Sequence, residues 1–182
     1  MGRRDVVVTG LGVVSPVASE LSRFWDGIKN GQSGIDLVKG VDDIDQYPVR
    51  IGGEIRDLDV DKFLEKKEAR IMDPFAIWGL SASIMAIEDS GLDLDAIDLQ
   101  RVGVIASSGI GGMQYMQEQS ARAVKGGPRR ISPQLIPQMI VNILSGYVAI
   151  KYGFKGPNFS VTSACASGTH SIGEAMRMIQ YD

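Results

Sequence analysis

Phe159-Ser-Val-Thr-Ser-Ala-Cys-Ala-Ser-Gly168 is the stretch that decides the fold. A short run with β-branched residues, expected to be a strand, ends in small residues, and a helical pattern follows from Ala166 to Gln180. A strand that turns sharply into a helix is the building unit of α/β proteins. At the turn lies Cys165, the only cysteine of the chain. The stretch therefore predicts a fold class and a candidate reactive group together.

Two interpretations of Cys165 are open at this point. In the first, the dipole and the unpaired N–H groups of the helix N-terminus favour a thiolate, presented by a turn like the nucleophile elbow of hydrolases. In the second, the residue is a buried and inert cysteine. Helical spacing brings Cys165, Ile172, Met176 and Ile179 near one face, which predicts a sulfur directed into the core. His170 is rotated from Cys165 by about 140°, so we expect a local structural role for it and a catalytic base from elsewhere.

The rest of the chain alternates between strand-like and helix-like segments. Asp73 and Pro74 form the clearest helix start, with Leu80 and Ile84 among the residues of its apolar face. Ser19 is the expected cap of the first helix. This alternation predicts a single α/β domain with a largely parallel sheet. The expected strands are residues 6–9, 49–55, 101–106 and 158–162, and the expected helices are residues 19–31, 73–91, 113–124, 132–150 and 166–180.

Composition excludes several classes of protein. The chain has 182 residues, of which 44% are apolar and 23% charged, as in ordinary globular proteins. A formal net charge of −3 argues against a globally basic nucleic-acid binder. One cysteine and one histidine exclude an intrachain disulfide and a Cys/His zinc site, and we expect no metal. No apolar stretch approaches the ~20 residues that span a bilayer, and no signal peptide is present, so we expect a soluble, cytoplasmic protein with no membrane partner.

Charge and glycine are distributed unevenly along the chain. Ten acidic residues lie from Asp36 to Glu68, whereas the interval between Glu118 and Glu174 holds six basic residues and no acidic one. This asymmetry is explained equally well by an anionic partner and by a solvated face.

The glycine-rich stretches at residues 10–12 and 109–112 both lack the third glycine of a dinucleotide-binding fingerprint, which favours simple tight turns after strands.

Six short motifs, taken together, resemble those of the β-ketoacyl-[acyl carrier protein] synthases, most closely the type II synthases. These are the elongating condensing enzymes of bacterial fatty acid synthesis. The resemblance runs along essentially the whole chain, in the family's order and spacing. It rests on residues 6–16 (VVVTGLGVVSP), 32–35 (QSGI), 72–75 (MDPF), 108–112 (SGIGG), 127–133 (GPRRISP) and 163–168 (SACASG).

The resemblance implies the thiolase fold, in which two similar α/β halves form a five-layered structure that dimerises through a shared sheet. Residues 1–182 correspond to the N-terminal half, a single thiolase-like domain without the C-terminal half. The position of Asp182, directly after a helix with no following strand, also suggests an incomplete sheet.

The resemblance further implies a decarboxylative Claisen condensation. Cys165 matches the nucleophile that takes an acyl group from its carrier protein, after which malonyl-carrier protein loses CO2 and its carbanion attacks the acyl-cysteine. No cofactor is implied, because phosphopantetheine arrives on the acyl carrier protein. The family's two catalytic histidines, its lysine and a gating phenylalanine lie in the second half, so residues 1–182 alone are not expected to complete the reaction.

Other residues match single functional positions of the family. Ile110 matches a residue that lines the acyl pocket, and Leu135 a residue that the partner subunit of a homodimer contributes to that pocket. Four basic residues match positions that bind the acidic carrier protein: Lys67, Arg70, Arg129 and Arg130. At Ile71 the type II synthases often have lysine. Two alternatives remain: a polyketide-type ketosynthase or thiolase, and a non-catalytic partner subunit or scaffold of the same fold.

Overall fold

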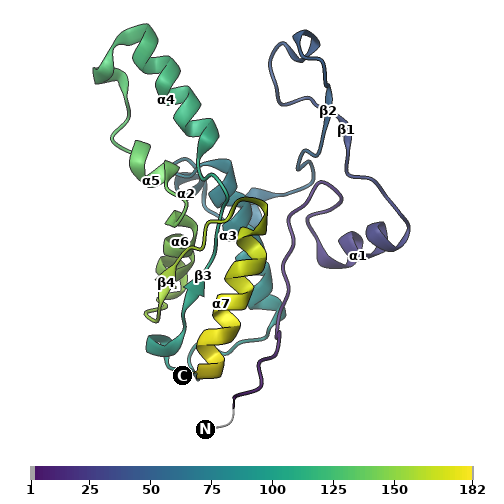
Figure 1. The fold of residues 1–182 in the computed structure, drawn as a ribbon, viewed down its shortest axis with the longest axis vertical. Coiled ribbons are helices and arrows are strands. Elements are labelled where there is room, and N and C mark those ends of the chain that lie inside the picture. Colours follow the sequence, from purple (N-terminus) through teal and green to yellow (C-terminus); the bar gives the residue numbers. More distant parts are fainter. Residues whose placement is uncertain (1–2, 182) are drawn as a thin grey trace.

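A computed structural model describes residues 3–181, and Figure 1 shows the arrangement of its elements. Two short sheets are present in this part of the chain, one antiparallel and one parallel. The strands are β1 (Asp36–Leu37), β2 (Ile51–Gly52), β3 (Val104–Ile105) and β4 (Asn158–Phe159). The helices are α1 (Leu21–Lys29), α2 (Lys66–Ala69), α3 (Pro74–Asp89), α4 (Met113–Gly126), α5 (Leu135–Met139), α6 (Ile143–Tyr152) and α7 (Ser167–Tyr181).

The core lies around α3 and α6, beside the parallel pair of strands. Leu80 and Ile84 of α3 and Leu144 and Val148 of α6 are buried together. The two helices approach closely at Gly79, where an added Cβ would lie 2.4 Å from a methyl carbon of Leu144. Both α6 and α7 contact β3, which pairs with β4 through Val104–Asn158 and Ile105–Phe159. The helix that follows Cys165 therefore lies against the same parallel strand as the core helix α6.

The start of α3 agrees with its prediction. Asp73 caps the helix, accepting a hydrogen bond from the Phe75 N–H at 3.1 Å, and Pro74 occupies the first helical position. The second carboxylate oxygen accepts the Tyr115 N–H at 2.9 Å, in the first turn of α4. Asp73 is 3% exposed. A single buried carboxylate thus caps two helices whose starts are about forty residues apart, a contact that the local sequence pattern did not predict.

The N-terminal strand prediction is wrong. Residues 6–9 form no strand, and Val7 and Val8 are each 76% exposed. The segment instead runs along α3, where an added Cβ at Gly10 or Gly12 would lie about 2 Å from a main-chain oxygen of that helix (2.1 and 1.9 Å). Gly10 and Gly12 therefore allow the N-terminal segment to pack closely against the backbone of α3, and they do not form the tight turn that was predicted. A β-branched run favours extended backbone, but a sheet also needs a neighbouring strand, and the described chain places a helix here.

Two helix predictions need correction. Helix α1 is capped by Glu20, whose carboxylate accepts the Ser22 N–H at 3.0 Å, and not by Ser19. The helix expected over residues 132–150 is divided into α5 and α6. The backbone is extended at Ile140, and beside this break the Gly112 N–H donates to the Met139 carbonyl oxygen at 2.9 Å. The carbonyl oxygen of Met139, the last residue of α5, is thus bound by the glycine-rich loop that contains Gly112.

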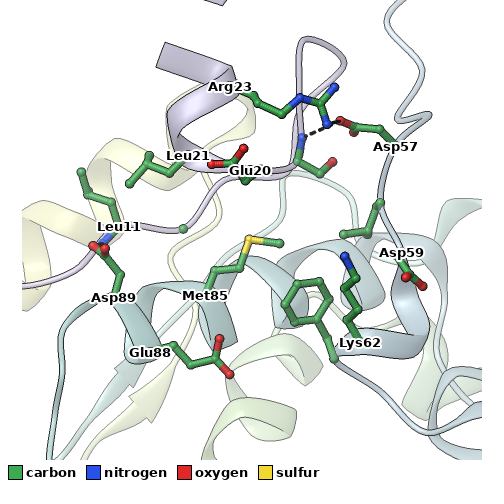
Figure 2. Close-up of a pocket in the computed structure, with 14 residues that line it drawn as sticks. Leu11, Glu20, Leu21, Arg23, Asp57, Asp59, Lys62, Met85, Glu88 and Asp89 are labelled. Atoms are coloured by element: carbon green, nitrogen blue, oxygen red, sulfur yellow. Dashed lines mark hydrogen bonds and ion pairs between the residues drawn. The ribbon is translucent and has the colours of Figure 1, made fainter. Parts of the chain in front are cut away.

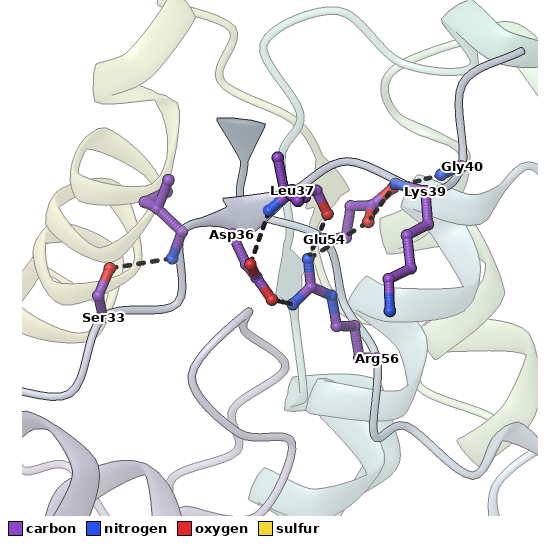
Figure 3. A network of polar contacts seen from close by, with 8 residues as sticks. Ser33, Asp36, Leu37, Lys39, Gly40, Glu54 and Arg56 are labelled. Atoms are coloured by element: carbon purple, nitrogen blue, oxygen red, sulfur yellow. Dashed lines mark hydrogen bonds and ion pairs between the residues drawn. The ribbon is translucent and has the colours of Figure 1, made fainter. Parts of the chain in front are cut away.

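The acid-rich segment after α1 is a surface excursion. Strands β1 and β2 pair antiparallel there, and Figure 3 shows the polar network beside them. The Glu54 carboxylate accepts the N–H groups of Lys39 (3.0 and 3.1 Å) and Gly40 (2.6 Å), and these bonds hold the pKa of Glu54 below its usual value. The Leu37 N–H and the Arg56 guanidinium lower the pKa of Asp36 in the same way. Hydrogen bonds and ion pairs, rather than apolar packing, hold this excursion together.

No helix formed by residues 3–181 combines the length and the apolar character that a membrane crossing requires.

Candidate functional site around Cys165

Cys165 lies on a sharp corner between β4 and α7. Residues Ala164–Ala166 form one 3-10 turn, and α7 begins at Ser167, so Cys165 lies two positions before the helix. Ala164 has a φ of +51°, in the left-handed region that side-chain-bearing residues rarely adopt. Such a conformation costs on the order of 1–3 kcal/mol and persists only when its surroundings enforce it. The corner is therefore a strained presentation of the cysteine, as the predicted elbow requires.

The thiol is directed outward, contrary to its prediction. Cys165 is exposed, which also contradicts the interpretation as a buried, inert cysteine. Ile172, Met176 and Ile179 are 71%, 43% and 48% exposed. Helical spacing identifies residues that share a face, but not what covers that face. Within residues 3–181 this face of α7 is left largely uncovered.

His170 has the local role that its position predicts. Its Nδ1 atom lies 2.6 Å from the Ser163 hydroxyl oxygen, within hydrogen-bond distance. The imidazole thus binds the residue that begins the corner. A base for chemistry at Cys165 has to be supplied from elsewhere.

The backbone of Cys165 offers a donor at the site. Within residues 3–181, nothing accepts a hydrogen bond from the Cys165 N–H. A free N–H next to a nucleophilic sulfur can stabilise the negative charge that develops on a carbonyl oxygen during acyl transfer. The corner therefore combines an exposed thiol with a main-chain donor that could serve acyl transfer.

The glycine-rich loop after β3 lies against this corner. An added Cβ at Gly109 would lie 3.2 Å from the Ala164 carbonyl oxygen, and Ile110 is the next residue, 68% exposed. Gly111 has a φ of +84°, which is a tight turn as predicted. The loop is held to α5 by the bond from Gly112 to Met139, and Leu135 lies half-buried at the other end of α5. The structure thus brings Ile110 to the corner and connects Leu135 to it through one short helix.

The four basic residues predicted to bind a carrier protein do not form one patch. Lys67 pairs with Glu65 at 2.8 Å, which raises the pKa of the Lys67 ammonium. Arg70 lines a hollow of about 380 Å³ between the starts of α3 and α4, together with Arg122. Arg129 and Arg130 are exposed and belong to the turn Pro128–Arg130. This turn follows the end of α4 (Figure 1). No described carboxylate forms an ion pair with Arg70, Arg129 or Arg130.

Two larger hollows lie away from the sulfur. The first, about 570 Å³, is shown in Figure 2 between the start of α1 and the second half of α3. Five carboxylates and two basic side chains line it, and Arg23 pairs with Asp57 at 3.3 Å across it. The second, about 510 Å³, is largely apolar and lies between β3 and α7, where it includes Met178 and Ile179. Cys165 lines neither of them.

Residues 3–182 match the family model "Beta-ketoacyl synthase, N-terminal domain". The chain belongs to the β-ketoacyl synthase family. It is 40% identical to the 3-oxoacyl-[acyl-carrier-protein] synthase 2 of Vibrio harveyi over 181 residues, all of this chain and 43% of that protein. It is 42% identical to the enzyme of the same name from Coxiella burnetii over 182 residues, 44% of that protein. The chain thus spans less than half the length of these curated relatives.

Solved structures of ketosynthases share the fold. One, titled the ishigamide ketosynthase/chain length factor, has a TM-score of 0.88 at 24% identity and covers 98% of this chain and 45% of its own. Another is a type II polyketide ketosynthase in complex with its acyl-carrier protein, with a TM-score of 0.79 at 23% identity, covering 97% of this chain and 46% of that one. The predicted α/β, thiolase-like fold of an N-terminal half is confirmed.

The sequence pattern did not indicate Ala164 and Ser167 as functional residues. Both belong to the run of small residues around Cys165. In the structure, Ala164 provides the left-handed backbone of the corner, and the buried hydroxyl of Ser167 binds it. The presence of a serine three residues after the corner's left-handed position was the one available signal, because serine hydroxyls often bond nearby main-chain groups.

Proposed function

We propose that this chain carries the acyl-accepting half of a synthase that elongates fatty acyl chains, with Cys165 as the nucleophile. The observation that supports the proposal is the exposed thiol on the strained corner at Ala164, beside a free N–H donor. The names of the relatives at about 40% identity point to the fatty acid pathway rather than to polyketide synthesis or thiolysis.

In the first step, the Cys165 thiolate attacks the carbonyl carbon of an acyl group held as a thioester on the acyl carrier protein. A carbon–sulfur bond to Cys165 forms, and the bond to the phosphopantetheine sulfur breaks, so that the carrier leaves as a thiol after taking up a proton. The oxyanion of the tetrahedral intermediate can accept a hydrogen bond from the Cys165 N–H. Covalent catalysis of this kind divides one difficult condensation into two easier steps.

In the second step, malonyl-carrier protein loses CO2, and the electron pair of the broken carbon–carbon bond forms a carbanion. The carbanion attacks the acyl carbon on Cys165, a new carbon–carbon bond forms, and the cysteine leaves as a thiolate. The only histidine of the chain, His170, is bound to Ser163, so the groups that assist decarboxylation belong to other parts of the complete protein. The proposal needs no cofactor beyond the phosphopantetheine that the carrier brings.

The proposed partners are an acyl carrier protein and a second copy of the chain. An acidic carrier is suited to Arg129 and Arg130, which are exposed and lack an ion-pair partner among the described residues. In the proposed homodimer, Leu135 completes the acyl pocket of the partner subunit near Ile110. A cytoplasmic location belongs to the same proposal.

The acylated cysteine is the direct test of this function. The complete protein, incubated with an acyl-carrier protein that carries a fatty acyl group, should gain the mass of one acyl group on the peptide that contains Cys165. Because Cys165 is the only cysteine of residues 1–182, the modified peptide is unambiguous for this part of the protein. Transfer from the acyl carrier protein but not from acyl-CoA distinguishes the proposed synthase from a thiolase. An unmodified Cys165 would instead support the non-catalytic subunit.

Charge reversal tests the proposed carrier surface. Replacing Arg129 and Arg130 together by glutamate should weaken binding of the acyl carrier protein about tenfold at low salt, and less at high salt, because exposed charges are screened. The matched control reverses Lys151 and Lys155, which changes the net charge equally on another surface. Binding can be followed by titration of a fluorescent carrier. Equal losses in both double variants, or no loss in either, would assign Arg129 and Arg130 to an ordinary solvated face.

A further inference from the structure

The hydroxyl group of Ser167 forms two hydrogen bonds to the corner before Cys165. It accepts the Ser163 N–H at 2.9 Å and donates to the Ala164 carbonyl oxygen at 2.7 Å. Ser167 is 3% exposed, so water does not replace these bonds. The two bonds bracket Ala164, whose φ of +51° is the least favourable backbone angle of the corner. The Ser167 hydroxyl therefore binds the main chain just before Ala164 and at the Ala164 carbonyl.

A chain of further serine hydroxyls anchors Ser167 itself. Ser171, which is 5% exposed, donates to the Ser167 carbonyl oxygen at 2.9 Å and lies 2.5 Å from the Ser107 hydroxyl oxygen. Ser107 also accepts the Val161 N–H at 2.9 Å. Because the Ser171 proton is used toward Ser167, Ser107 must be the donor between the two hydroxyls. The hydroxyl groups of Ser107, Ser167 and Ser171 then each donate one hydrogen bond and accept one. A buried network in which every donor is satisfied in this way is rigid.

We propose that Ser167 is the positioning residue of the Cys165 nucleophile: its hydroxyl holds Ala164 in the left-handed conformation that presents the thiol and its N–H to the substrate. The inference rests on the proposed function of Cys165 and assigns a role to a different residue. Without the hydroxyl, the Ser163 N–H loses its partner, and Ala164 relaxes toward the negative φ that an alanine prefers. The thiol would then leave the geometry in which it attacks.

The test compares single and double variants of the complete protein. Ser167→Ala should lower kcat for acylation of Cys165 about tenfold, with the KM for the acylated carrier unchanged, because a small misplacement of a reacting group is costly while the carrier surface is intact. Adding Ala164→Gly to this variant should restore most of the lost kcat, since glycine adopts a positive φ without steric cost. A purely structural role for Ser167 predicts no such rescue.

Ser145→Ala is the matched control. Ser145 is fully buried on α6 and donates one hydrogen bond to the Asn142 carbonyl oxygen at 2.9 Å, but it does not touch the corner. It should lower the thermal midpoint to a similar extent as Ser167→Ala while leaving the acylation rate unchanged. Wild-type kcat in Ser167→Ala, or no recovery on adding Ala164→Gly, would overturn the proposal.

Alkylation by iodoacetamide separates this inference from the proposed function. The reagent needs no carrier protein, so the alkylation rate tests the positioning even if Cys165 accepts no acyl group. The wild type should be alkylated fastest, the double variant more slowly, and Ser167→Ala most slowly. If Ser167→Ala does not fold, Ala164→Val and Ala164→Gly take its place. Ala164 is exposed, and a β-branched residue adopts positive φ with more difficulty than glycine. The valine variant should react more slowly than the glycine variant, and equal rates would contradict the proposal.

Discussion

Replacing Cys165 by serine should lower the rate of acyl-chain elongation by at least about a thousandfold. Serine has nearly the same size, and Cys165 is exposed, so the substitution removes the nucleophile without disturbing the packing. A serine hydroxyl is not ionised near neutral pH, and the corner provides no base to activate it, because His170 is bound to Ser163. Elongation by the complete protein can be measured as the product formed from acyl- and malonyl-carrier proteins.

The variant also needs a measurement that shows an intact protein. Cys165→Ser should keep the thermal midpoint of the wild type and its affinity for the acyl carrier protein within about twofold, because neither the core nor the basic residues change. Elongation retained in this variant would move the nucleophile to another residue. Lost carrier affinity would instead indicate that the substitution disturbs the fold.

Replacing Asp73 by alanine should lower the free energy of unfolding by about 3 kcal/mol, since a helix cap contributes about 1 kcal/mol and hydrogen bonds to a charged group somewhat more. The carboxylate is buried and satisfies N–H groups of both α3 and α4. Both groups lose their partner in the variant. The expected loss is large because water has little access to replace them.

Amide hydrogen exchange locates the effect. The amides of Phe75 and Tyr115 should exchange faster in Asp73→Ala, and urea unfolding gives the total loss. Asp73→Asn should fall between the wild type and the alanine variant, since its amide keeps one acceptor oxygen. The control is Asp98→Ala, which removes a single exposed bond to the Gln100 N–H at 2.9 Å and should lower the free energy of unfolding by less than about 1 kcal/mol. Similar losses of unfolding free energy in Asp73→Ala and Asp98→Ala would show that the contact of Asp73 with a second helix does not stabilise the protein.

Local features of the fold were predictable from the sequence. The cap and the apolar face of α3 were identified because both depend on residues within a few positions of each other. The strand–turn–helix around Cys165 was identified for the same reason. The strand prediction for residues 6–9 was wrong, because an extended run becomes a strand only when another strand lies beside it.

The location of the candidate site was predictable from the sequence, and its orientation was not. Cys165 stood out as the one cysteine in a run of small residues, and the motif residues around it led to the family that residues 3–182 match. The direction of its sulfur was predicted wrongly, since helical periodicity carries no information about the covering of α7. The strain at Ala164 and the bonds from Ser167 appear only in the folded chain.

The sequence by itself determined the α/β character of the chain, its family, the identity of the candidate nucleophile and the start of α3. Only the tertiary structure decided that Gly10 and Gly12 press against α3, that Asp73 reaches Tyr115, and that Cys165 faces outward. The physical reason is the range of the interactions. Caps and turns are set by neighbours along the chain, whereas close approaches and exposure depend on which distant segments pack together.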